Sequence, residues 1–101
     1  MATSKIKAPM RIDYSSGTSV AASTDIPITK NKVLIGNLLS NSNAFARVIV
    51  DGVEVTSGRG TTSGNTVFPI FIPLYAGQTL RLSPSDANAT FDCKLYDVIG
   101  A

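Results

Sequence analysis

Apolar and polar residues alternate along much of this chain, most regularly through residues 44–57. At the centre of that segment, Asp51-Gly52 is a dipeptide that forms tight two-residue turns between β-branched neighbours. Residues equidistant from such a turn face each other across a hairpin, and here two of these pairs consist of valines. The expected pairs are Val50 with Val53 and Val48 with Val55. This segment therefore predicts an antiparallel β-hairpin with one buried face.

Similar alternation recurs at short intervals elsewhere, and no segment has the periodicity of a helix. The further strands expected are 10–14, 26–28, 32–39, 66–74, 78–83 and 89–98. The segment 14–19, YSSGTS, is expected to be a turn or loop. About seven or eight short strands with turn residues between them are typical of an all-β sandwich, and we expect an antiparallel jelly-roll-like β-sandwich. An immunoglobulin-like sandwich is the alternative, although the chain has no tryptophan for its Cys…Trp…Cys signature. We expect residues 1–9 to form a flexible N-terminal arm and residues 10–101 a single domain.

Composition narrows the classes of function. Charged residues make up only 16% of the 101 residues and the net charge is +2, which does not indicate nucleic-acid binding. The single cysteine, Cys93, predicts neither an internal disulfide nor a zinc cluster, and histidine is absent. No apolar run approaches the length of a membrane span and no signal peptide is recognisable. We therefore expect a protein made in a cytoplasm, with no membrane contact.

Two of the expected strands, 32–39 and 66–74, are apolar on both sides, whereas a sandwich strand needs only one apolar side. The second side must be covered, either by loops and the N-terminal arm or by another subunit. We favour a subunit interface in a closed homo-oligomer, preferably a trimer. The candidate interface residues are Leu34, Leu38, Val67, Pro69 and Phe71.

Residues able to do chemistry are few. The glycine-rich segment 57–65 has no following helix and no Gly-Lys-Ser/Thr ending, so a flexible connection is expected rather than a phosphate-binding loop. The carboxylates are spread over different strands and turns, and Cys93 lies on an apolar face with no base beside it. We expect no catalytic residue, metal site or cofactor, and no enzymatic activity.

A binding role for exposed aromatic residues is the second hypothesis. Tyrosines can stack on sugar rings, Tyr75 falls at a predicted turn, and Tyr96 points outward by alternation. Arg59, in the glycine-rich segment, could contact an acidic partner. A carbohydrate-binding adhesion module that recognises a cell-surface glycan through Arg59, Tyr75 or Tyr96 is therefore the alternative function.

The Val-Asp-Gly-Val hairpin, the Gly/Ser/Thr loop and the segment Leu74 to Leu82, LYAGQTLRL, together resemble small β-structured accessory proteins of tailed bacteriophages. The resemblance covers residues 44–98. It implies a non-enzymatic virion protein, either a capsid decoration protein or a fibre or tail module. Such a protein is usually homotrimeric, is made in the host cytoplasm and attaches to other virion proteins. The resemblance carries no site motif and so assigns no functional residue.

Overall fold

The computed structural model describes residues 11–99, which form eight strands and contain no helix. The expected arm at 1–9 lies outside the described residues, as do Met10 and the last two residues of the expected domain. The strands are β1 (Arg11–Ser19), β2 (Ile26–Pro27), β3 (Lys32–Ser40), β4 (Phe45–Val50), β5 (Val53–Arg59), β6 (Thr66–Leu74), β7 (Thr79–Pro84) and β8 (Ala89–Ile99).

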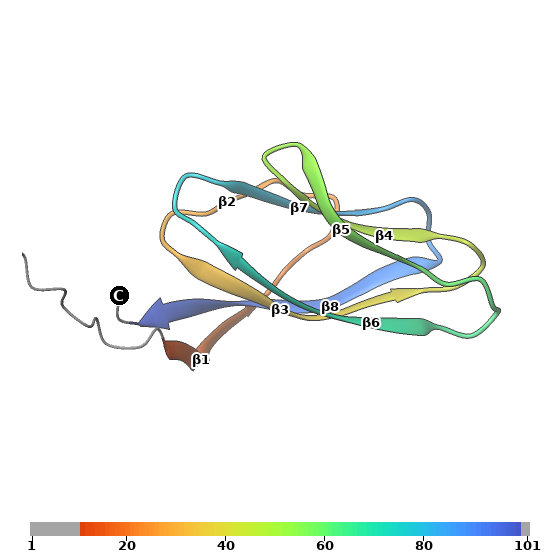
Figure 1. Cartoon of the computed structure of the whole chain (residues 1–101), viewed down its shortest axis with the longest axis horizontal. Coiled ribbons are helices and arrows are strands. Elements are labelled where there is room, and N and C mark those ends of the chain that lie inside the picture. The colour runs from red at the N-terminus through yellow and green to blue at the C-terminus, as the bar shows by residue number, and fades with distance from the viewer. Residues whose placement is uncertain (1–10, 100–101) are drawn as a thin grey trace, which may run out of the picture.

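The strands form two antiparallel sheets of four, in the orders β1-β8-β3-β6 and β2-β7-β4-β5. The sheets lie face to face as two layers (Figure 1). Every connection except the β4–β5 hairpin crosses from one sheet to the other. This is the strand order of a jelly roll, so the expected fold is confirmed.

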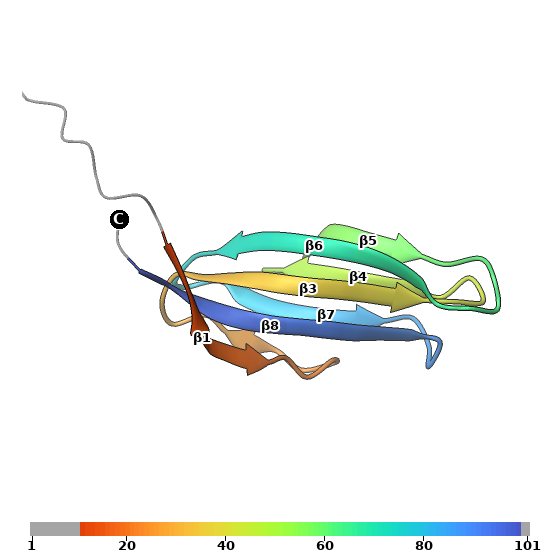
Figure 2. The ribbon, with the colours of Figure 1, turned by 90° about the horizontal axis from the view of Figure 1, so that it is seen from below.

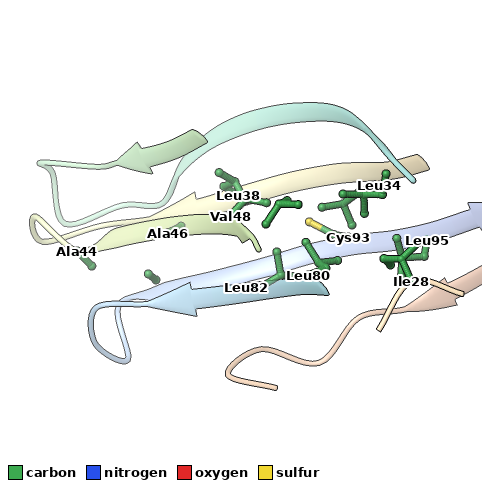
Figure 3. Close-up of a cluster of buried hydrophobic side chains, with 13 residues drawn as sticks. Ile28, Leu34, Leu38, Ala44, Ala46, Val48, Leu80, Leu82, Cys93 and Leu95 are labelled. Atoms are coloured by element: carbon green, nitrogen blue, oxygen red, sulfur yellow. The ribbon is translucent and has the colours of Figure 1, made fainter. Parts of the chain in front are cut away.

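The core fills the space between the two layers (Figure 3). Leu34 and Leu38 of β3 are fully buried there, so their assignment to an outer interface is wrong. The pairing with β8 determines which side of β3 meets the core. Leu34 lies opposite Leu95 and Leu38 lies opposite Phe91, and Leu95 and Phe91 are on the core side of β8. Since both sides of β3 are apolar, its own alternation could not distinguish inside from outside.

The β4–β5 hairpin differs from expectation by one residue. Its turn is as expected, with Asp51 and Gly52 both at positive φ, and Val50 pairs with Val53. Ile49 also pairs with Glu54 in the expected register, but the register shifts between Ile49 and Val48, so Val48 pairs with Thr56 rather than with Val55. Val53 and Val55 are 63% and 49% exposed. The expected four-valine buried face is therefore wrong for β5, which is an edge strand with a bulge.

Two segments expected to be loops are partly strand. β1 continues to Ser19 through residues 14–19, and β5 extends to Arg59, so the glycine-rich loop is shorter than expected. That loop is also anchored: Gly60 is buried, and its N–H donates a 3.0 Å hydrogen bond to Ser40 Oγ. Ser40, a fully buried polar residue, in turn donates its hydroxyl hydrogen to the Ala44 carbonyl. One side chain thereby ties together two loops at the same end of the sandwich.

Candidate functional site: the outer face of the first sheet

The outward side of β8, β3 and β6 is the most distinctive surface of the described residues. The register of the three strands places their outward residues in four rows that cross the sheet. We call these residues the β8–β3–β6 face. In the order β8, β3, β6, the rows are Thr90, Leu39, Val67; Asp92, Asn37, Pro69; Lys94, Ile35, Phe71; and Tyr96, Val33, Pro73.

Apart from Asn37, this face is apolar along β3 and β6, and it is mostly polar along β8. Val67 is 53% exposed and Phe71 is 59% exposed, while Ile35 and Leu39 beside them are half-buried. Val33 is buried, yet it is not part of the core cluster. The expectation that β3 and β6 are apolar on both sides is therefore confirmed, and Val67, Pro69 and Phe71 lie on the outer side as expected.

Apart from β1 at the end that carries Tyr96, no strand or loop within residues 11–99 lies across this face, which Figure 2 shows face on. The exposure of Val67 and Phe71 agrees with that view. Cover by loops, which was one of the two explanations for the doubly apolar strands, is therefore not found among the described residues. Whether another subunit covers the face remains a prediction.

The free edge of β6 is blocked against strand addition. β6 pairs with β3 without interruption from Thr66 to Leu74, although it contains Pro69 and Pro73, which have no N–H to donate. The two prolines are four residues apart, so both nitrogens point to the same side of the strand, and an unbroken ladder with β3 places that side at the free edge. The edge therefore lacks half of the donors that an added strand would need, and a partner would have to dock on the face.

The other three edge strands carry comparable devices. β2 has only two residues and one is Pro27. β5 is interrupted by its bulge and carries Glu54, and in β1 the residues between Asp13 and Thr18 bulge away from β8. Short edges, prolines, charges and bulges are how β proteins prevent edge-to-edge association. Contact through a face is thus the remaining route for association by either sheet.

The bulge of β1 covers one end of the β8–β3–β6 face. Tyr14 packs edge-on against Tyr96, with ring centroids 5.6 Å apart. The backbone of β1 at Gly17 also packs closely on Tyr96. This position requires a glycine, because a Cβ there would lie 2.6 Å from the Tyr96 ring. Tyr96 points outward as expected but is only half-buried beneath this bulge, whereas Tyr14 is 68% exposed. The sequence did not indicate this pair, since 14–19 was expected to be a loop.

The three candidate ligand contacts do not form one site. Arg59 lies on the second sheet, where its guanidinium is 5.2 Å from the Phe45 ring centroid and Nη2 donates to Asn43 Oδ1 at 3.4 Å. Tyr75 follows the end of β6, about nine residues or roughly 30 Å of strand from the loop after Arg59. Tyr96 lies on the first sheet. Tyr96 and Tyr75 lie toward the same end of the first sheet, since Tyr96 pairs with Val33 and Val33 pairs with Pro73, two residues before Tyr75. A glycan site built from these residues could therefore use the two tyrosines but not Arg59.

A shallow groove of about 350 Å3 lies on the second sheet beside the hairpin turn. Its two carboxylates already have partners: Asp25 forms a 3.0 Å ion pair with Arg81, and Asp51 accepts a 2.9 Å hydrogen bond from the Thr79 N–H. Because both acids serve the structure of the turn and the strand pair, the groove offers no free acid or base. No group of three or more metal-ligating side chains occurs in the part of the chain that the structure describes.

A cluster of opposite charges lies where β3 begins and β8 ends. Asp97 forms ion pairs with Lys32 at 2.8 Å and with Lys30 at 3.0 Å. The hydrogen bond from Lys32, followed by that from Lys30, lowers the pKa of the Asp97 carboxyl. Ser16 Oγ accepts the Asp97 N–H at 2.7 Å, which ties the β1 bulge to the same point. The cluster fastens β1, β3 and β8 together and was not recognised in the sequence.

Cys93 is buried in the core, as expected. Burial raises the pKa of its thiol from 9.0 to about 11. The Sγ–H donates to the Asn37 carbonyl at 3.5 Å. A thiol that is inaccessible and protonated at neutral pH is a poor nucleophile, so Cys93 acts as a small core residue.

No helix in the described part of the chain is long and apolar enough to cross a membrane. No family model, no curated protein and no solved structure matches this chain.

Proposed function

We propose that this chain is a non-enzymatic structural module that assembles through its β8–β3–β6 face. The observation that carries the proposal is the exposure of Val67 and Phe71, on the part of the sheet face that lies away from the β1 bulge and that no other segment of residues 11–99 covers. The edge strands of both sheets oppose the addition of a further strand, which supports a contact made by the side chains of this face. The proposal gives the second apolar side of β3 and β6 a role that the fold of one chain does not require.

The energetic argument is direct. Full burial of a valine or phenylalanine side chain contributes about 1.5–3 kcal/mol. With more than half of Val67 and Phe71 in water, these two side chains forgo roughly 2–3 kcal/mol in an isolated chain. That is a substantial part of the stability of a domain this size, which is about 5–15 kcal/mol. Association would recover this free energy in every copy.

The setting that we propose is a bacteriophage particle, with the chain attached to a capsid or tail surface as a decoration protein or a fibre module. This rests on the resemblance of residues 44–98 and on the jelly roll, a fold that viral capsid proteins share with lectins. A fold does not by itself specify a function. The neighbouring genes test the setting: capsid or tail genes beside this one would support it, and a neighbourhood without structural genes of a phage would contradict it.

Assembly is tested by the mass of the full chain in solution, measured by light scattering after size-exclusion chromatography. We expect a multiple of the 10.6 kDa chain mass at concentrations of about 1–100 µM, the range of moderately stable complexes. Phe71→Ser and Val67→Ser should shift the protein toward the monomer. A wild-type protein that stays monomeric over the whole range would refute the proposal.

Val53→Ser is the matched control, because Val53 is as exposed as Phe71 but lies on the edge strand of the second sheet. It should leave the mass unchanged. If Val53→Ser and Phe71→Ser dissociate the protein equally, the contact does not use the β8–β3–β6 face. Circular dichroism of each variant checks that the strands are retained.

A further inference from the structure

The charges on the β8–β3–β6 face have an arrangement that bears on its partner. Asp92 and Lys94 are the only charged residues in the four rows, and they occupy adjacent rows on the same strand. Both are exposed, and among residues 11–99 neither forms an ion pair. Their spacing along β8 is about 7 Å. The face is therefore neutral as a whole, with one positive and one negative position side by side.

Given the proposed function, we infer that the occupant of this face is a second copy of the chain. The two copies pack face to face about a two-fold axis that crosses the strands at the level of Gly36. Rotation about this axis places Asp92 of each copy opposite Lys94 of the other. Packed sheets lie about 10 Å apart, a gap that an aspartate and a lysine side chain can span together.

The same rotation matches the apolar rows. The axis runs across the strands, so β6 of one copy lies over β6 of the other, with its direction reversed. The row of Pro69 then faces the row of Phe71, and the row of Val67 faces the row of Pro73. A rotation about an axis parallel to the strands and through β3 would instead lay β8 over β6, with Asp92 against Pro69 and Lys94 against Phe71. Both charges would then be buried against apolar side chains without a partner, which opposes association. The charges thus select one of the two simple face-to-face arrangements.

The area available is that of a small dimer interface. Three strands about 4.8 Å apart and nine residues with a rise of about 3.4 Å give a flat area of roughly 440 Å2. Side-chain relief adds to this flat area, which is about half of the roughly 800 Å2 per partner of a standard protein interface. An isologous contact also needs only one apolar patch, whereas a ring of three needs two different, complementary patches.

Charge reversal tests the arrangement in the full-length protein. In a dimer of the Asp92→Lys variant, the new lysine at position 92 of each copy faces Lys94 of the other, so two pairs of like charges form. In a dimer of Lys94→Asp, two pairs of aspartates face each other in the same way. We expect each single variant to weaken self-association at least tenfold, as measured by sedimentation, and to recover partly in high salt. The double variant D92K/K94D restores both pairs and should associate like the wild type. Glu54→Lys, an exposed reversal on the second sheet, is the control and should have no effect.

Mixing provides the decisive measurement. D92K and K94D chains should each be mainly monomeric alone and form a heterodimer when combined, since every facing pair is then of opposite charge. Two results would overturn the arrangement but leave assembly intact. In the first, both single variants associate as well as the wild type. In the second, the double variant stays dissociated while the wild type associates. A mass of three chains would also overturn the arrangement. A wild-type protein that never associates would refute the proposed function itself.

Discussion

The buried hydroxyl of Ser40 gives the sharpest test of how this fold is held together. Its Oγ accepts the Gly60 N–H at 3.0 Å and donates to the Ala44 carbonyl, and the residue has no exposed surface. Ser40→Ala removes both hydrogen bonds without adding volume. Two backbone groups in a buried site then lose their partner, and neither gains access to water.

Each buried polar group left without a partner costs about 1–3 kcal/mol. We therefore expect Ser40→Ala to lower the free energy of unfolding by roughly 2–4 kcal/mol, of a total of about 5–15 kcal/mol. With a urea m-value of about 1–3 kcal/mol per M for a domain this small, the unfolding midpoint should fall by roughly 1–2 M. Urea titration followed by circular dichroism measures this shift.

Ser85→Ala is the matched control. Ser85 Oγ also accepts a backbone N–H, that of Phe45 at 2.8 Å, but Ser85 is exposed and water can replace the hydroxyl. Its loss should cost about 0.5–1.5 kcal/mol at most. If Ser40→Ala were no more destabilising than Ser85→Ala, burial would not be what gives the Ser40 hydrogen bonds their importance, and the reasoning would fail.

Three further outcomes are expected. Gly36→Ala should lower the free energy of unfolding, measured in urea, by about 3 kcal/mol or more, because a Cβ there would lie 2.1 Å from the Asp92 carbonyl oxygen. Gly64→Ala is the control: Gly64 has open space around it, so this change should alter stability by less than about 0.5 kcal/mol. The buried Cys93 thiol should resist a thiol reagent until the protein unfolds. Because its pKa is raised from 9.0 to about 11 in the folded protein, the free energy of unfolding of the wild type should decline between these pH values. A Cys93→Ala variant whose stability declined equally would contradict this. Because the pKa of Asp97 is lowered in the folded protein, its charge stabilises the fold at pH values above the ordinary carboxyl pKa of about 3.9. The difference in melting temperature between wild type and Asp97→Asn should therefore be constant above about pH 5 and vanish in stronger acid. A difference that persists in strong acid would exclude the ion pairs as its cause.

The sequence was sufficient for the fold class and for most strands, because alternation and turn residues are local signals. The range 66–74 agrees with β6 at both ends, and Asp51-Gly52 forms the expected turn. Alternation could not place Leu34 and Leu38, since a strand that is apolar on both sides has no marked inner face. Only pairing with β8, more than fifty residues away in sequence, determines which side meets the core.

The same limitation explains the other errors. A bulge such as the one at Val55 depends on how an edge strand twists against its neighbour, and nothing in alternating valines indicates it. The Tyr14–Tyr96 contact and the Asp97 ion pairs join segments that are distant along the chain. The outward position expected for Val67, Pro69 and Phe71 on β6 is confirmed, and their role in an interface stays a prediction. The outward position expected for Leu34 and Leu38 on β3 was wrong.

The two faces of the sandwich differ in a way that would limit assembly. On the second sheet, the outward residues around Ile49 include Arg81 and Glu54, and Arg59 covers the exposed ring of Phe45. The centre of that face is thus polar, and its exposed valines, Val53 and Val55, lie on the edge strand β5. All four edges carry features that oppose strand addition. A module with two apolar faces would stack into open filaments, because each contact would leave another free face. In the proposed contact the β8–β3–β6 face pairs with itself, so each copy uses the same surface and assembly stops at a closed pair.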